Sequence, residues 1–193
     1  MMNKYVAFLR GINSGSNPTL KMETLRAIFE NIGFLNVKTL LASGNVVFDT
    51  EQSERQNLET ILEKELEAKL GYKVAVIVLD SEKIKRLIES RPFEGIRINP
   101  QTRLYITFTK GVRTKTLAIP YSDATQRFVI LGEDHGIIRS TVDLDKGMTP
   151  DLMSALDKNF GKNNTTRNWN TIEKVFSVMS QPVVSPEADK SPQ

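Results

Sequence analysis

Short apolar runs alternate with segments of helical periodicity through the first eighty residues of the chain. Leu25, Ile28, Phe29 and Ile32, for example, repeat at the spacing of one helical face. The expected elements are strands in residues 4–10, 36–43, 45–49 and 73–80, and helices in residues 20–32 and 53–71. This β-α-β-β-α-β order predicts a ferredoxin-like unit with four antiparallel strands and both helices on one face.

The second half repeats the mixture of strands and helices, and we expect a second α+β unit there. Its expected elements are helices in 81–90, near 150–161 and after Asn170, and strands in 103–109, 127–132 and 136–144. The predicted domains are therefore residues 1–80 and 81–181, followed by a disordered tail in 182–193 with three prolines. A duplication of the first unit rests on element order alone, because no residue-level repeat is visible.

Composition narrows the classes of chemistry that the chain can carry. It has 193 residues, no cysteine and one histidine, so disulfides, thiolate catalysis and sulfur-based zinc sites are excluded, and we expect no metal site. No apolar run reaches the roughly 18 to 20 residues of a membrane span. The net charge of +3 comes from mixed signs and says little about nucleic acid. We expect a cytoplasmic protein without a membrane partner.

Residues 160–176 (FGKNNTTRNWNTIEKVF) gather more hydrogen-bonding capacity than one helix start requires. Asn170 and Glu173 predict a capping box. Arg167 and Asn168 precede the expected helix, where free amides and the helix dipole favour an anion, and Trp169 offers a flat face. The alternative is a well-capped turn with a core tryptophan, and the sequence leaves both interpretations open.

Two earlier segments share this polar character. Arg10 ends the first expected strand, and Gly11 begins a glycine-bearing loop that leads into a helix. This layout is typical of anion-binding loops, although the Gly-Lys-Ser/Thr ending of a Walker loop is missing. Residues Ser43, Gly44 and Asn45 predict a tight hairpin turn, for which a purely structural role is favoured.

The single histidine, His135, falls in a predicted hairpin turn, where we expect an exposed side chain. No Ser-His-Asp or Cys-His set can be assembled from these residues. We therefore assign no catalytic residue and no cofactor, and the sequence leaves open whether the protein is an enzyme.

Three motifs in order resemble the bacterial domain-of-unknown-function family 1697. They are FLRGIN with the following KMETLRAIFENIGF, then VKTLLASGNVVF, then FGKNNTTRNWNTIEKV, and the similarity covers residues 4–180. The resemblance implies a ferredoxin-like α/β fold, a cytoplasmic protein and an unresolved function. One departure is Ser16, where the family usually has a second glycine. The family motif positions are Arg10, Gly11, Asn13, Met22, Ser43, Gly44, Asn45, Arg167, Asn168, Trp169, Asn170 and Thr171.

These observations favour a protein that binds a small anionic or nucleotide-like ligand through polar loops at helix N-termini. Two alternatives stay open: single-stranded nucleic-acid binding on the sheet, and a non-catalytic interaction module. Nucleic acid is less favoured, because Tyr5 and Phe8 point to opposite faces of their strand. The oligomeric state is open. The expected ligand-binding residues are Arg10, Gly11, Asn13, Ser43, Gly44, Asn45, Arg167, Asn168 and Trp169.

Overall fold

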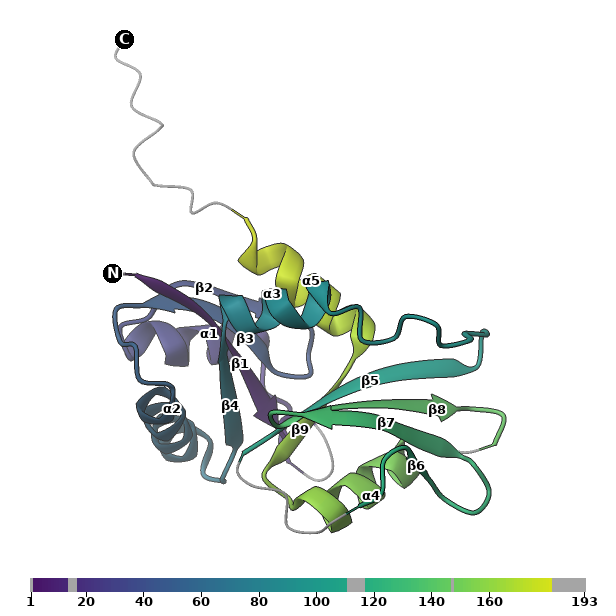
Figure 1. Cartoon of the computed structure of the whole chain (residues 1–193). Coiled ribbons are helices and arrows are strands. Elements are labelled where there is room, and N and C mark those ends of the chain that lie inside the picture. Colours follow the sequence, from purple (N-terminus) through teal and green to yellow (C-terminus); the bar gives the residue numbers. More distant parts are fainter. Residues whose placement is uncertain (1, 14–16, 111–116, 147, 182–193) are drawn as a thin grey trace.

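The computed structural model describes residues 2–13, 17–110, 117–146 and 148–181, which form two antiparallel sheets and five helices (Figure 1). The four-stranded sheet has the order β2-β3-β1-β4. Its elements follow the predicted β-α-β-β-α-β order, so the α+β class is confirmed. They are β1 (Asn3–Arg10), α1 (Met22–Asn31), β2 (Leu35–Leu40), β3 (Asn45–Thr50), α2 (Arg55–Leu70) and β4 (Ala75–Asp80).

Helices α1 and α2 cover one face of this sheet, as their apolar periodicity requires. Leu25 and Phe29 of α1 and Leu62 of α2 are fully buried against strand residues such as Phe48. Gly71 ends α2 in the left-handed conformation, at φ 77°, which glycine adopts without steric cost. Burial of this apolar face is the main source of stability for both helices.

Strand β4 lies at an edge of the sheet, and its outward amides are satisfied by side chains of α2. The Val76 amide donates to Glu63 Oε1 at 2.8 Å, and the Val78 amide donates to Glu59 Oε1 at 2.9 Å. Lys110 Nζ lies 2.5 Å from Glu63 Oε1 and 3.4 Å from Glu59 Oε2. Two carboxylates therefore complete the hydrogen bonds of the edge, and Lys110 compensates their charge.

The second sheet has the order β6-β7-β8-β5-β9. Strands β7 and β8 alternate buried and half-buried positions, and Ile130, Ile138 and Val142 pack on Leu152 and Leu156 of α4. The remaining elements are α3 (Ser81–Glu89), β5 (Thr102–Thr109), β6 (Tyr121–Ser122), β7 (Phe128–Asp134), β8 (Ile137–Asp143), α4 (Thr149–Phe160), β9 (Asn164–Asn168) and α5 (Trp169–Met179).

Helices α3 and α5 cover the other face of the first sheet, and Figure 1 shows them beside each other above it. Ile84 of α3 and Ile172 of α5 belong to a core that also contains Phe8 of β1 and Phe108 of β5. The rings of Phe8 and Phe108 stack with centroids 4.8 Å apart. The two sheets therefore share one apolar core. The division at residue 80 stays a prediction, and the predicted tail, 182–193, lies outside the described residues.

Three local predictions were wrong. Residues 164–168, expected to be a loop before a helix, form strand β9 beside β5. The N-cap of α5 is Asn168 and the helix begins at Trp169, whereas the predicted capping box had Asn170 as the N-cap. The spacing of Ser53 and Gln56 predicts a capping box for α2, but Glu54 is the N-cap of this helix and no side chain caps it. Tertiary pairing with β5 decides the first two cases, because the polar sequence there has no strand periodicity of its own.

Candidate functional site

The three polar motifs meet at one end of the first sheet. The amide of Leu9, at the end of β1, donates to the carbonyl of Gly44 at 2.8 Å. Strand β9 lies against this corner, and its Arg167 enters it. Segments separated by more than a hundred residues therefore form one polar cluster, which we call the Arg167 cluster: Leu9, Ser43, Gly44, Asn45, Thr165, Thr166 and Arg167.

The guanidinium of Arg167 donates to protein acceptors throughout this cluster. Its Nε donates to Asn45 Oδ1 at 2.5 Å. Its Nη2 donates to the carbonyls of Leu9 at 2.6 Å and Ser43 at 2.9 Å, with that of Gly44 at 3.2 Å. Its Nη1 donates to Thr165 Oγ1 at 2.7 Å and to the carbonyl of Thr166 at 2.8 Å. Every guanidinium nitrogen is thus hydrogen-bonded within the protein.

Arg167 is also withdrawn from solvent. Its exposed fraction is 7%, and its guanidinium carbon lies 5.6 Å from the centre of the Phe8 ring. Burial lowers the pKa of Arg167 to about 10, which still leaves the guanidinium charged at neutral pH. Because no carboxylate accompanies it in the cluster, carbonyl and amide oxygens compensate the desolvation of the charge.

Arg10 fixes the neighbouring corner to the second half of the chain. Its Nη1 donates to the carbonyls of Lys162 and Asn164 at 2.8 and 2.9 Å, and its Nη2 donates to Asp157 Oδ2 at 2.7 Å. Burial alone would raise the pKa of Asp157, but hydrogen bonds from Arg10 and Asn164 and the charge of Arg10 lower it overall.

The glycines and asparagines of the first two motifs have structural contacts of their own. Asn13 donates to the carbonyls of Leu20 and Ala42 at 3.0 and 2.9 Å. Gly44 is buried at φ 76°, and a Cβ there would lie 2.5 Å from Ile12 Cδ1. Gly11, by contrast, is exposed at φ 79° with open space around it.

Asn168 and Trp169 lie just beyond the cluster. Asn168 accepts a hydrogen bond from the Asn170 amide at 3.0 Å and caps α5. The indole of Trp169 meets the ring of Phe93 edge-on, with centroids 5.5 Å apart. The nine expected ligand-binding residues are thus largely gathered in one region. Their role toward a ligand stays a prediction, because the contacts described for them are contacts within the protein.

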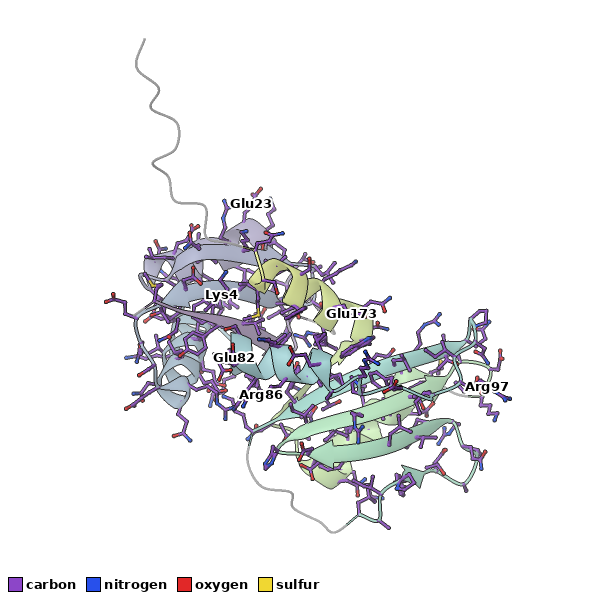
Figure 2. The ribbon with its side chains drawn as sticks, turned by 45° about the horizontal axis from the view of Figure 1, so that its top comes forward. Lys4, Glu23, Glu82, Arg86, Arg97 and Glu173 are labelled. Carbon is purple, nitrogen blue, oxygen red and sulfur yellow. The ribbon has the colours of Figure 1, made fainter. Side chains whose placement is uncertain are left out.

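A second region has a different character. A cavity of about 710 Å³ opens between β4 and α3 on one side and β5 and the β7–β8 hairpin on the other. Its charged lining residues are Arg55, Lys83, Arg86, Arg139 and Asp134, with His135 at the hairpin. Figure 2 shows Arg86 on α3, toward the second sheet. We call this region the basic cleft.

The position of Arg139 in the cleft depends on Gly132. A Cβ at Gly132 would collide with the Arg139 guanidinium, so the glycine leaves the space in which that side chain lies across β7. Arg139 Nη1 also approaches the carbonyl of Pro92, at 3.4 Å. This arginine belongs to β8, a central strand of the second sheet, and its side chain is half-buried.

The sequence analysis did not single out the residues of this cleft. Lys83 and Arg86 have the appearance of an ordinary solvated helix face. Arg139 gave a weaker signal: in the alternating pattern of β8 it lies between the buried Ile138 and Ser140, so its side chain points to the opposite face of the strand. His135 was correctly expected to be exposed: its side chain is 94% accessible.

Two classes of site have no candidate in the described ranges. No three His, Asp or Glu side chains gather closely enough there to hold a metal ion. No described helix is both long enough and apolar enough to cross a membrane.

Comparison with known proteins identifies the family. The family described as protein of unknown function (DUF1697) matches residues 2–130. The chain belongs to this family. The match includes the Arg10 and Ser43–Asn45 motifs and ends before β9, so Arg167 lies outside it. No match was found among curated proteins.

The chain is also similar to a solved structure, that of the conserved bacterial protein SP0830 from Streptococcus pneumoniae. The two share 20% sequence identity and superpose with a TM-score of 0.65 over 93% of this chain and 99% of that one. At this identity the likeness shows the fold alone. It supports a mixed α+β architecture over nearly the whole length of this DUF1697 member.

Proposed function

We propose that the protein binds a small anionic ligand in the basic cleft. The observation that carries this proposal is the excess of cations: among the described residues, Arg55, Lys83, Arg86 and Arg139 line the cleft with one carboxylate, Asp134. Four positive charges against one negative charge give the lining a formal charge of +3, with His135 neutral. Such a concave surface concentrates positive potential and attracts anions.

The pairing of these charges strengthens the proposal. Arg55 Nε lies 3.8 Å from Glu59 Oε1, so part of its charge is compensated. Among the described residues, no carboxylate lies within 4.0 Å of the charged nitrogens of Lys83, Arg86 or Arg139. Three cations that face a cavity without a carboxylate counter-ion are suited to hold an anion from solution.

The size of the cleft fits a small molecule. Ligand pockets commonly measure about 300–1,000 Å³, and this cavity measures about 710 Å³. The proposal keeps the ligand class expected from the sequence. It is supported by side chains of α2, α3 and β8. The nine ligand-binding residues expected from the sequence are not among those that line the cleft.

The nucleic-acid alternative receives less support. Base stacking on a sheet needs exposed aromatic side chains, but Tyr5, Phe8 and Phe48 are at most 5% exposed. Helices α1 and α2 cover one face of that sheet, and α3 and α5 cover the other. These contacts favour the anion-binding proposal over nucleic-acid binding on the sheet.

The experiment is titration calorimetry with inorganic phosphate and pyrophosphate at low salt. We expect binding that is tighter for pyrophosphate and that weakens by about tenfold in Arg86→Gln and in Arg139→Gln, since each loses a charge-assisted contact. Lys85→Gln is the matched control: it removes a charge from the same helix at an exposed position outside the cleft. The absence of binding for both anions, or an equal loss in Lys85→Gln, would contradict the proposal.

A further inference from the structure

We infer that the ligand of the basic cleft is an organic phosphate, in which a phosphate group is joined to an apolar ring. This inference rests on the proposed function and adds the class of molecule. It starts from the other half of the lining, because five apolar side chains share the cavity with the cations: Ile77, Leu79, Leu87, Phe108 and Ile137.

The apolar side chains form a floor that belongs to the core shared by the two sheets. Ile77 and Leu79 of β4 and Phe108 of β5 are buried members of that core, and Ile137 at the start of β8 packs against it. Phe108 is held from behind by the ring of Phe8. This floor is therefore rigid, and an apolar group laid on it removes apolar surface from water.

The cations and the floor meet on one face of α3. Arg86 and Leu87 lie three and four residues after Lys83, so both are neighbours of Lys83 on the same side of the helix. Arg139 faces them from β8. A ligand that reaches both surfaces must carry its negative charge on one end and its apolar group on the other.

The charge balance favours phosphate over carboxylate. Lys83, Arg86 and Arg139 lack a carboxylate partner among the described residues, as shown above. A monoester phosphate carries nearly two negative charges at neutral pH and offers three acceptor oxygens, whereas a carboxylate carries one charge and two oxygens. The phosphate group therefore compensates more of the positive charge of this lining than a carboxylate does.

The volume argues for a ring. An inorganic phosphate would leave most of a cavity of about 710 Å³ filled with water over apolar side chains. Covering those side chains with a ring of the ligand gains free energy at roughly 25 cal/mol for each Å² of apolar surface removed from water. The affinity should therefore grow with the size of the ring at constant charge.

The test is a series of monoester phosphates with the same anion: methyl, phenyl and 2-naphthyl phosphate, measured by titration calorimetry against the full chain. We expect affinity to rise by about tenfold from methyl to phenyl phosphate, and again to naphthyl phosphate. Arg86→Gln should weaken all three by the same factor. Ile137→Ser should flatten the series, because it should weaken naphthyl phosphate binding more than phenyl phosphate binding, and methyl phosphate binding least.

The outcomes separate the two proposals. Ile98→Ser is the control for Ile137→Ser, because Ile98 is 59% exposed and lies outside the cleft. Equal affinity for the three phosphates would contradict the inference that the ligand carries an apolar ring, but not the proposal that the cleft binds an anion. No binding of any of them would overturn both. A series that survives unchanged in a folded Ile137→Ser protein would place the ring elsewhere and overturn the inference, and the wild-type series remains decisive if that variant does not fold.

Discussion

The Arg167 cluster and the basic cleft use the same kind of side chain in opposite ways. In the cluster, one buried guanidinium is surrounded by carbonyl, hydroxyl and amide oxygens that use every nitrogen. In the cleft, Lys83, Arg86 and Arg139 border a cavity, and no carboxylate of the described residues lies within 4.0 Å of their charged nitrogens. An arginine that lacks a carboxylate partner within the protein is therefore the better indicator of a binding site. A polar motif alone does not distinguish a structural contact from a binding site.

The largest effect is expected for Arg167→Gln. This variant leaves the buried carbonyl of Leu9 and the buried Oδ1 of Asn45 without the donors that Arg167 supplies, and each unsatisfied group costs about 1–3 kcal/mol. We expect the free energy of unfolding, measured in urea, to fall by about 3 kcal/mol or more. Arg97→Gln, at an exposed position, should change it by less than about 0.5 kcal/mol. An Arg167→Gln protein as stable as the wild type would contradict the structural role of the Arg167 cluster.

Gly44→Ala should destabilise the same corner by about 1–3 kcal/mol. The new Cβ would lie 2.5 Å from Ile12 Cδ1, and the backbone is held at φ 76°. Gly71→Ala is the matched control, because φ is 77° there and nothing lies within 4 Å of the new atom. The difference in melting temperature between the two variants measures the steric contribution of Ile12. Equal losses of melting temperature would show that the Ile12 side chain moves aside freely.

A smaller, pH-dependent effect is expected for Asp157→Asn, which removes the carboxylate partner of Arg10. We expect a loss of about 1 kcal/mol at neutral pH. The pKa of Asp157 is lowered from its ordinary value of 3.8. Its stabilising effect is therefore complete above that value and disappears as pH falls through the lower folded value. The difference between wild type and variant in urea unfolding should therefore shrink as pH falls below 3.8, and a constant difference would show that the charge is unimportant.

The smallest change in stability is expected in the cleft. Arg86 is exposed and lies at the cavity, so Arg86→Gln should alter the free energy of unfolding by less than about 0.5 kcal/mol. The same variant should lose anion affinity, as stated above. Its thermal unfolding without ligand is the measurement. A large loss would mean that the cleft, like the Arg167 cluster, is part of the framework of the fold.

The elements with regular apolar spacing could be predicted from the sequence. Helix α2, with Leu58, Leu62 and Leu66 on its buried side, and strands β7 and β8, with their alternation, are examples. Strand β9 could not, because Asn164, Thr165 and Arg167 are polar and buried only through contacts with distant segments. A strand of that kind has no apolar period to reveal it.

The candidate site shows the same limit. The motif residues were found, but their meeting at one corner depends on the packing of β9 against the end of β1, which local patterns do not record. The cleft was missed because Lys83 and Arg86 belong to different turns of α3 and Arg139 to a distant strand. Only the fold places them around one cavity.

The carboxylates of Glu59 and Glu63 have a consequence for contacts between copies of the chain. An unpaired outer strand offers a template on which a strand from another molecule can grow. At β4 the amides of Val76 and Val78 are already engaged by these carboxylates. A second molecule would have to displace two charged groups to extend this sheet, so association through β4 is discouraged and self-assembly, where it occurs, is directed to other surfaces.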